Sequence, residues 1–129
     1  MCDIIDIQFK ITNLKMDYDL EERTAKFSEA VIDFVRTLKQ NSVNLPLISQ
    51  VIKSATSIGA NYCEANNASS KSDFRNKIFI CKKEASETKY WFRIIARANE
   101  DKKDICKILW KEASELTMIF SKITTSSAK

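Results

Sequence analysis

The sequence contains no histidine, one glycine and one proline. Hairpins and phosphate-binding loops depend on glycine and proline, so their scarcity excludes a glycine-rich nucleotide loop and favours helices joined by short connections. Without histidine, a serine or cysteine nucleophile has no imidazole base, and a mixed zinc site cannot be completed. The chain has 129 residues, of which 44% are hydrophobic. We therefore expect a single all-α domain with its own core.

The cysteines and the N-terminal residues bear on the cellular compartment. Cys2, Cys63, Cys81 and Cys106 show no C-x-x-C spacing, so we interpret them as reduced, packed thiols. The first ten residues carry acids where a signal peptide would carry bases, and no apolar run approaches the roughly 18 residues of a membrane span. These features predict a soluble cytoplasmic protein with no membrane partner.

Apolar residues spaced alternately four and three apart predict four helices, at about 19–40, 45–66, 71–99 and from about 103 onward. Asp17 or Asp19, Asn44 and Ser70 are the expected N-caps. We predict an antiparallel up-down-up-down four-helix bundle over residues 17–125. A short arm, 1–16, precedes it, and residues 5–11 of this arm alternate as a half-buried strand does. Residues 126–129 form a disordered tail.

The helix at 71–99 presents two distinct surfaces. Residues 71–111 hold twelve Lys and Arg against six acids, whereas residues 1–70 hold seven against nine. At about 100° per residue, the cations of this helix fall on one strip. A positive strip can attract nucleic-acid phosphates, although a solvated lysine face is the simpler reading. The candidate nucleic-acid contacts are Lys82, Lys89, Arg93 and Arg97.

Apolar surface on the same helix extends beyond what one bundle core covers. Ile80, Trp91 and Ile94 lie on the flank opposite the cations. An apolar flank left outside the core is typical of a contact between subunits. We predict that these three residues lie near an oligomer interface.

Polar residues border the expected core. A ladder of small polar groups follows the second helix, where Gly59 predicts a close approach of another backbone. An acid facing the core needs a partner, and the candidates are Lys83, Arg36, Asn61 and the serines of this ladder. The predicted structural polar seam consists of Ser57, Asn61, Glu64, Glu84, Glu87 and Glu112.

Two E-x-x-E pairs, Glu84 with Glu87 and Glu112 with Glu115, leave a metal-dependent nucleotide hydrolase as an alternative. Such pairs are common on charged helices, and related di-metal bundles use E-x-x-H. We therefore predict that the chain is not an enzyme. No catalytic, cofactor-binding or metal-ligating residue is assigned, and no cofactor is expected.

Residues 45–99 resemble a known family. Ser57, Ile58, Asn61 and Glu64 match its S-I-x-x-N-x-x-E element, and Ala85, Ser86 and Glu87 match its second element. The family comprises four-helix-bundle proteins encoded in intervening sequences of bacterial 23S rRNA, whose biochemical role is unsettled. The chain is also similar to the accessory proteins of diversity-generating retroelements. The chain departs from many relatives at Ala65 and Asn66, which follow Glu64.

The resemblance implies a homopentamer that associates with RNA or DNA, with a reverse transcriptase or a ribosome-associated protein as a further partner. Together with the basic strip, it leads us to expect a non-enzymatic accessory or scaffold protein bound to nucleic acid. A protein–protein interaction scaffold without nucleic acid is the alternative.

Overall fold

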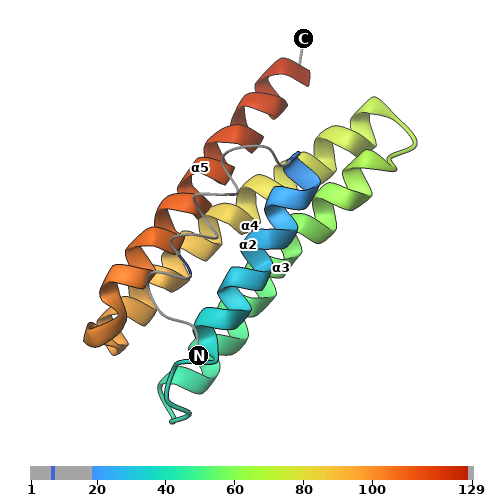
Figure 1. The fold of residues 1–129 in the computed structure, drawn as a ribbon. Coiled ribbons are helices and arrows are strands. Elements are labelled where there is room, and N and C mark those ends of the chain that lie inside the picture. Colours follow the sequence, from blue (N-terminus) through green and yellow to red (C-terminus); the bar gives the residue numbers. More distant parts are fainter. Residues whose placement is uncertain (1–6, 8–18, 128–129) are drawn as a thin grey trace.

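The computed structural model describes residue 7 and residues 19–127, which contain four long helices and no strand. These are α2 (Leu20–Val35), α3 (Asn44–Asn66), α4 (Lys71–Ala98) and α5 (Lys103–Ser127), with a short 3₁₀ helix, η1 (Glu100–Lys102), before α5. Successive helices run in alternating directions and lie side by side (Figure 1). The predicted all-α, up-down-up-down four-helix bundle is thus confirmed.

Two of the three predicted N-caps are confirmed. The Asp19 carboxylate accepts the Glu22 N–H at 2.9 Å, and the Ser70 hydroxyl oxygen accepts the Asp73 N–H at 3.0 Å, as predicted. The prediction of Asn44 as an N-cap is wrong. The Asn41 side chain instead accepts the Asn44 N–H at 2.8 Å. Asn44 is buried, and its amide exchanges two hydrogen bonds with the Asn99 amide, at 3.0 and 2.9 Å.

The core combines apolar side chains from all four helices. Ring pairs reach across the bundle: Phe34 lies 6.1 Å from Phe92, and Tyr62 lies 5.9 Å from Phe120, between ring centroids. The described cysteines are free thiols. Burial raises the pKa of Cys81 and Cys106 to about 12, so both behave as small apolar side chains.

Gly59 marks a close approach of α2 to α3. A Cβ built at this position would lie 3.1 Å from the Thr24 Oγ1 and 3.7 Å from the Thr24 carbonyl carbon. The Thr24 hydroxyl is held in place because it donates to the Glu21 carbonyl oxygen at 2.9 Å. The predicted close approach at the only glycine is confirmed.

Two helix ends differ from the expected ones. α2 stops at Val35, because the N–H groups of Thr37 and Leu38 turn back onto the carbonyls of Phe34 and Val35. α5 continues to Ser127, whereas the sequence placed a disordered tail from residue 126. Residues 128 and 129 lie outside the described part.

The predicted arm, 1–16, also lies outside the described residues, except for Ile7. Ile7 has helical backbone and is fully buried in the core cluster, so the extended backbone expected there is not found. Among the helices that the structure describes, none is both long and apolar enough to cross a membrane.

Candidate nucleic-acid interface

The four predicted cations of α4 lie on one side of the helix. At about 100° per residue, Lys82, Lys89, Arg93 and Arg97 fall within roughly a quarter of the circumference. Lys82 and Lys89 are half-buried, while Arg93 and Arg97 are exposed. Arg97 approaches Glu100 at 3.7 Å, but both side chains are well exposed, so this ion pair adds little stability.

α5 adds cations that the sequence reasoning did not assign to the site. Lys103, Lys107 and Lys111 are exposed and recur every four residues, which places them along one side of α5. On this side of the bundle, Trp110 of α5 contacts α4, because its ring centroid lies 5.6 Å from the Lys89 Nζ. We call the surface formed by these residues the basic face: Lys82, Lys89, Arg93, Arg97, Lys103, Lys107 and Lys111. The four-residue spacing on α5 was the signal that could have extended the prediction.

The predicted subunit contact lies on the other flank of α4, the one that borders α3. Ile80, Trp91 and Ile94 are each half-buried. Trp91 packs edge-on against Tyr90, with ring centroids 5.1 Å apart. Within the described part of the chain, the buried Trp91 Nε1–H has no hydrogen-bond acceptor. An unpaired buried donor costs about 1–3 kcal/mol, so this flank is not optimised for an isolated bundle.

The predicted polar seam divides into two separate groups, and the first lies along α3 and α4. The Asn61 amide donates to the Ser57 carbonyl and hydroxyl oxygens, both at 2.8 Å, so these residues bond within α3. Glu64 reaches α4 through Lys77 at 3.7 Å. In the buried space between the two helices, the Thr88 hydroxyl donates to the Ser54 hydroxyl oxygen at 2.9 Å.

The two predicted seam acids of α4 differ in environment. Glu84 is half-buried, and burial, followed by the charge of Glu87, raises its pKa, whereas Lys83 and Lys53 oppose this shift. Glu87 is exposed. Lys83 is therefore one of two cations near Glu84, as considered from the sequence, but no ion pair is formed between them among the described residues.

The second group consists of Glu112 on α5 and its partner. The Glu112 side chain is fully buried and accepts two hydrogen bonds from Arg23 of α2, from Nε to Oε2 and from Nη2 to Oε1, both at 2.8 Å. This hydrogen bonding raises the pKa of Arg23 above its ordinary value. The expected partners, Lys83, Arg36 and Asn61, were wrong for this acid. Arg23 was missed because it lies 89 residues away in the chain.

This ion pair bears on the metal-hydrolase alternative. Both Glu112 oxygens face the Arg23 guanidinium, and Glu115 lies 3.6 Å from the same group. The E-x-x-E pair of α5 is therefore engaged by a cation from its own chain. Among the described residues, no three His, Cys, Asp or Glu side chains are grouped as a metal site would need.

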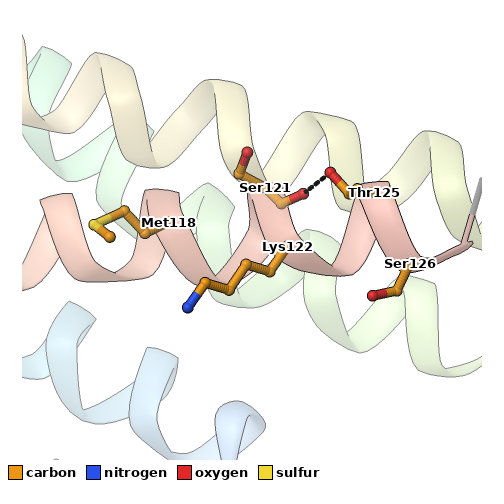
Figure 2. Close-up of a pocket in the computed structure, with 5 residues that line it drawn as sticks. All are labelled: Met118, Ser121, Lys122, Thr125 and Ser126. Atoms are coloured by element: carbon orange, nitrogen blue, oxygen red, sulfur yellow. Dashed lines mark hydrogen bonds between the residues drawn. The ribbon is translucent and has the colours of Figure 1, made fainter.

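Two hollows on the described surface are further places where a ligand could be considered. One, of about 450 Å³, lies along the last turns of α5 and is lined by Met118, Ser121, Lys122, Thr125 and Ser126 (Figure 2). One of its hydroxyl groups is already hydrogen-bonded within α5, since the Thr125 hydroxyl donates to the Ser121 carbonyl oxygen at 3.0 Å. The other, of about 410 Å³, lies between α2 and α3 and contains Cys63. Burial and the nearby Glu21 raise the pKa of this thiol, which makes it a poor nucleophile.

Comparisons with known proteins relate the chain to a family. A solved structure from Bacteroides thetaiotaomicron, described as a protein with unknown function from the S23 ribosomal protein family, is 28% identical to this chain. It superimposes with a TM-score of 0.72, covering 82% of this chain and 98% of that chain. No curated protein matches the sequence. The family model of the 23S rRNA-intervening sequence protein matches residues 16–124, which run from before α2 into the last turns of α5. The chain therefore belongs to the 23S rRNA-intervening sequence protein family.

Proposed function

We propose that the chain is a non-enzymatic homo-oligomer, a pentamer, that associates with RNA or DNA as an accessory or scaffold protein. The observation that carries this proposal is the basic face. α4 and α5 hold twelve Lys and Arg against six acids, whereas α2 and α3 hold three against five. Positive charge is thus concentrated on one half of the bundle, where it can neutralise backbone phosphates.

Assembly strengthens the argument for nucleic acid. One bundle offers few phosphate contacts, and each contact is weak at physiological salt. A closed ring repeats the basic face once per subunit and so multiplies the contacts available to one strand. The contacts are with phosphates, because long surface lysines and arginines on a helix pair carry no pattern that reads base edges. Little sequence preference and a steep dependence on salt follow.

The flank of Ile80, Trp91 and Ile94 supports the oligomer. These side chains are half-buried in one subunit, and a second copy would cover them further. The unpaired Trp91 indole N–H would gain an acceptor if a small rotation brought it to a carbonyl or carboxylate of the neighbouring subunit. The pentameric number rests on the resemblance described above.

One experiment tests both the binding of nucleic acid and the oligomeric state. RNA, DNA and hybrid duplexes are titrated at low salt with the wild type and with the variant Lys89→Gln/Arg93→Gln/Arg97→Gln, and light scattering gives the mass of each sample. We expect the variant to lose binding and to keep its fold and its oligomeric mass. The matched control, Arg36→Gln/Lys39→Gln/Lys53→Gln, removes three exposed cations from the α2–α3 half and should bind as the wild type does.

Three outcomes would overturn the proposal. A wild type that retards neither RNA nor DNA removes the nucleic-acid function. Equal losses from the two triple variants would mean that net charge alone governs binding. A monomer at tens of micromolar would remove the ring. In the first case, an interaction scaffold for another protein becomes the better account, and the exposed Phe79 and Tyr90 are the side chains that favour it.

A further inference from the structure

Trp110 is an unusual residue for the surface of a helical bundle. It is 40% exposed, although a tryptophan is among the side chains that gain most from burial. It does not belong to the flank of Ile80, Trp91 and Ile94, because its ring contacts the Lys89 side of α4. The packing of one subunit and the predicted subunit contact therefore both leave part of this ring uncovered.

The ring lies among the cations of the basic face. Lys107 and Lys111 flank it in sequence on exposed positions of α5, and Lys89 approaches it from α4. On α5, Glu115 lies five residues from Trp110 but approaches Arg23 at 3.6 Å, and the exposed Asp104 lies almost two turns away. An exposed aromatic ring set between cations is the arrangement with which proteins hold single strands: cations contact phosphates and the ring stacks on a base.

We propose that Trp110 is a stacking platform for an unpaired base and that the basic face consequently prefers single-stranded RNA or DNA to duplex. This inference rests on the proposed function. A base within a duplex is already stacked on its neighbours, so a ring on a helix surface reaches only a base that is splayed out. In the free protein the Lys89 ammonium takes the place of the ligand over the ring. When a strand binds, this ammonium transfers to a phosphate oxygen and the indole receives the base.

Tyr90 provides the comparison that singles out Trp110. Tyr90, which lies on α4, is more exposed, at 54%. Its ring, however, is engaged edge-on by Trp91 and makes no cation contact among the described residues. Stacking is therefore assigned to Trp110, and Tyr90 serves as the aromatic control.

The test measures the affinity of the full chain for a labelled oligodeoxythymidine of about 20 nucleotides and for a DNA duplex of similar length. Trp110→Leu should weaken binding of the single strand about 10-fold and leave duplex affinity and oligomeric mass unchanged. Trp110→Phe should retain most of the affinity, because phenylalanine still offers a ring. Tyr90→Leu should bind both probes as the wild type does.

Fluorescence gives a second readout. The chain has two tryptophans, Trp91 and Trp110, so the emission lost in Trp110→Phe belongs to Trp110. That part of the emission should be quenched by the single strand and unaffected by the duplex.

The possible failures are distinguishable. If the wild type binds neither probe, the proposed function fails and this inference fails with it. If it binds both probes and Trp110→Leu weakens both equally, or neither, only the stacking role is overturned. An equal loss from Tyr90→Leu, or a changed mass in Trp110→Leu, would also overturn it, the latter by placing Trp110 in a subunit contact.

Discussion

The two helical hairpins of this bundle are built differently. Between α2 and α3, small groups allow close packing: Gly59 faces Thr24, and the Ser28 hydroxyl reaches the Ala55 carbonyl oxygen at 3.3 Å. Between α4 and α5, long and aromatic side chains meet. Most of the exposed large hydrophobic residues that the structure describes lie on these two helices, namely Phe79, Tyr90, Trp110 and Met118, while Val43 and Leu45 lie at the start of α3. One hairpin uses its surface for internal contact, while the other leaves apolar and cationic surface available for binding.

The hairpins are joined by a few polar contacts in addition to the apolar core. Arg23 and Glu112 link α2 to α5, whereas Asn44 and Asn99 link the start of α3 to the end of α4. The comparison shows that the two halves, which differ in charge, are tied together by polar pairs that cross from one hairpin to the other. A half that is rich in cations gains an anchoring acid, Glu112, whose partner comes from the other half.

At neutral pH, the largest expected effect of a single substitution comes from breaking this link. Glu112→Ala should lower the free energy of unfolding by about 3 kcal/mol, because it leaves the largely buried Arg23 guanidinium without its carboxylate. Chemical denaturation measures the loss. Glu115→Ala is the control, since Glu115 is 43% exposed and lies 3.6 Å from Arg23, so its loss should be below about 1 kcal/mol. Equal, small effects of both substitutions would show that water solvates Arg23 in the Glu112 variant.

Alkaline pH should separate the buried thiols of α4 and α5 from the half-buried thiol of α3. Burial raises the pKa of Cys81 and Cys106 from 9.0 to about 12. Below pH 9 the thiols are protonated in both the folded and the unfolded chain. Above pH 9 the unfolded chain releases protons that the folded chain keeps, so the free energy of unfolding falls up to about pH 12, by about 1.4 kcal/mol per pH unit for each thiol.

The measurement is the difference in unfolding free energy between the wild type and each variant across this range. Cys81→Ala/Cys106→Ala should decline less steeply than the wild type, whatever its stability at neutral pH, and Cys63→Ala should decline almost as the wild type does. Parallel curves for the wild type and the double variant would show that the two thiols ionise without unfolding.

The smallest effect concerns the close packing of the α2–α3 hairpin. Gly59→Ala gains helix propensity, but its methyl group would meet the fixed Thr24 hydroxyl at 3.1 Å. We expect a net loss of about 1 kcal/mol in the free energy of unfolding. A double-mutant cycle with Thr24→Ala tests the cause, because removing the hydroxyl should recover part of the loss. Additive effects in this cycle would rule out the contact with Thr24.

The sequence predicted most of the fold because the relevant signals are local. The alternating four and three spacing located the helices, and Asp19 and Ser70 cap residues three positions away. Asn44 failed as a cap because α3 already begins there and its N–H is accepted by the Asn41 side chain, while its own side chain is used in a pair with Asn99, 55 residues distant. Local rules cannot anticipate such a pair.

The candidate site was predicted only where one helix sufficed. The helical rotation of about 100° per residue was enough to predict one side of α4 for the cations Lys82, Lys89, Arg93 and Arg97. The lysines of α5 and Trp110 join that face only once the rotation of α5 against α4 is known, and packing of the whole core determines that rotation. The partner of Glu112 was missed for the same reason.

Ile7 shows that the packed unit and the segment recognised by similarity have different borders. The family match begins at residue 16, yet Ile7 lies before it and is fully buried among the core side chains. Removing such an isoleucine side chain from a core costs roughly 2–5 kcal/mol. A chain shortened to the matched segment would contain all of α2, α3 and α4 but would lack this buried side chain. Its lower stability would then result from the truncation and not from the fold of the helices.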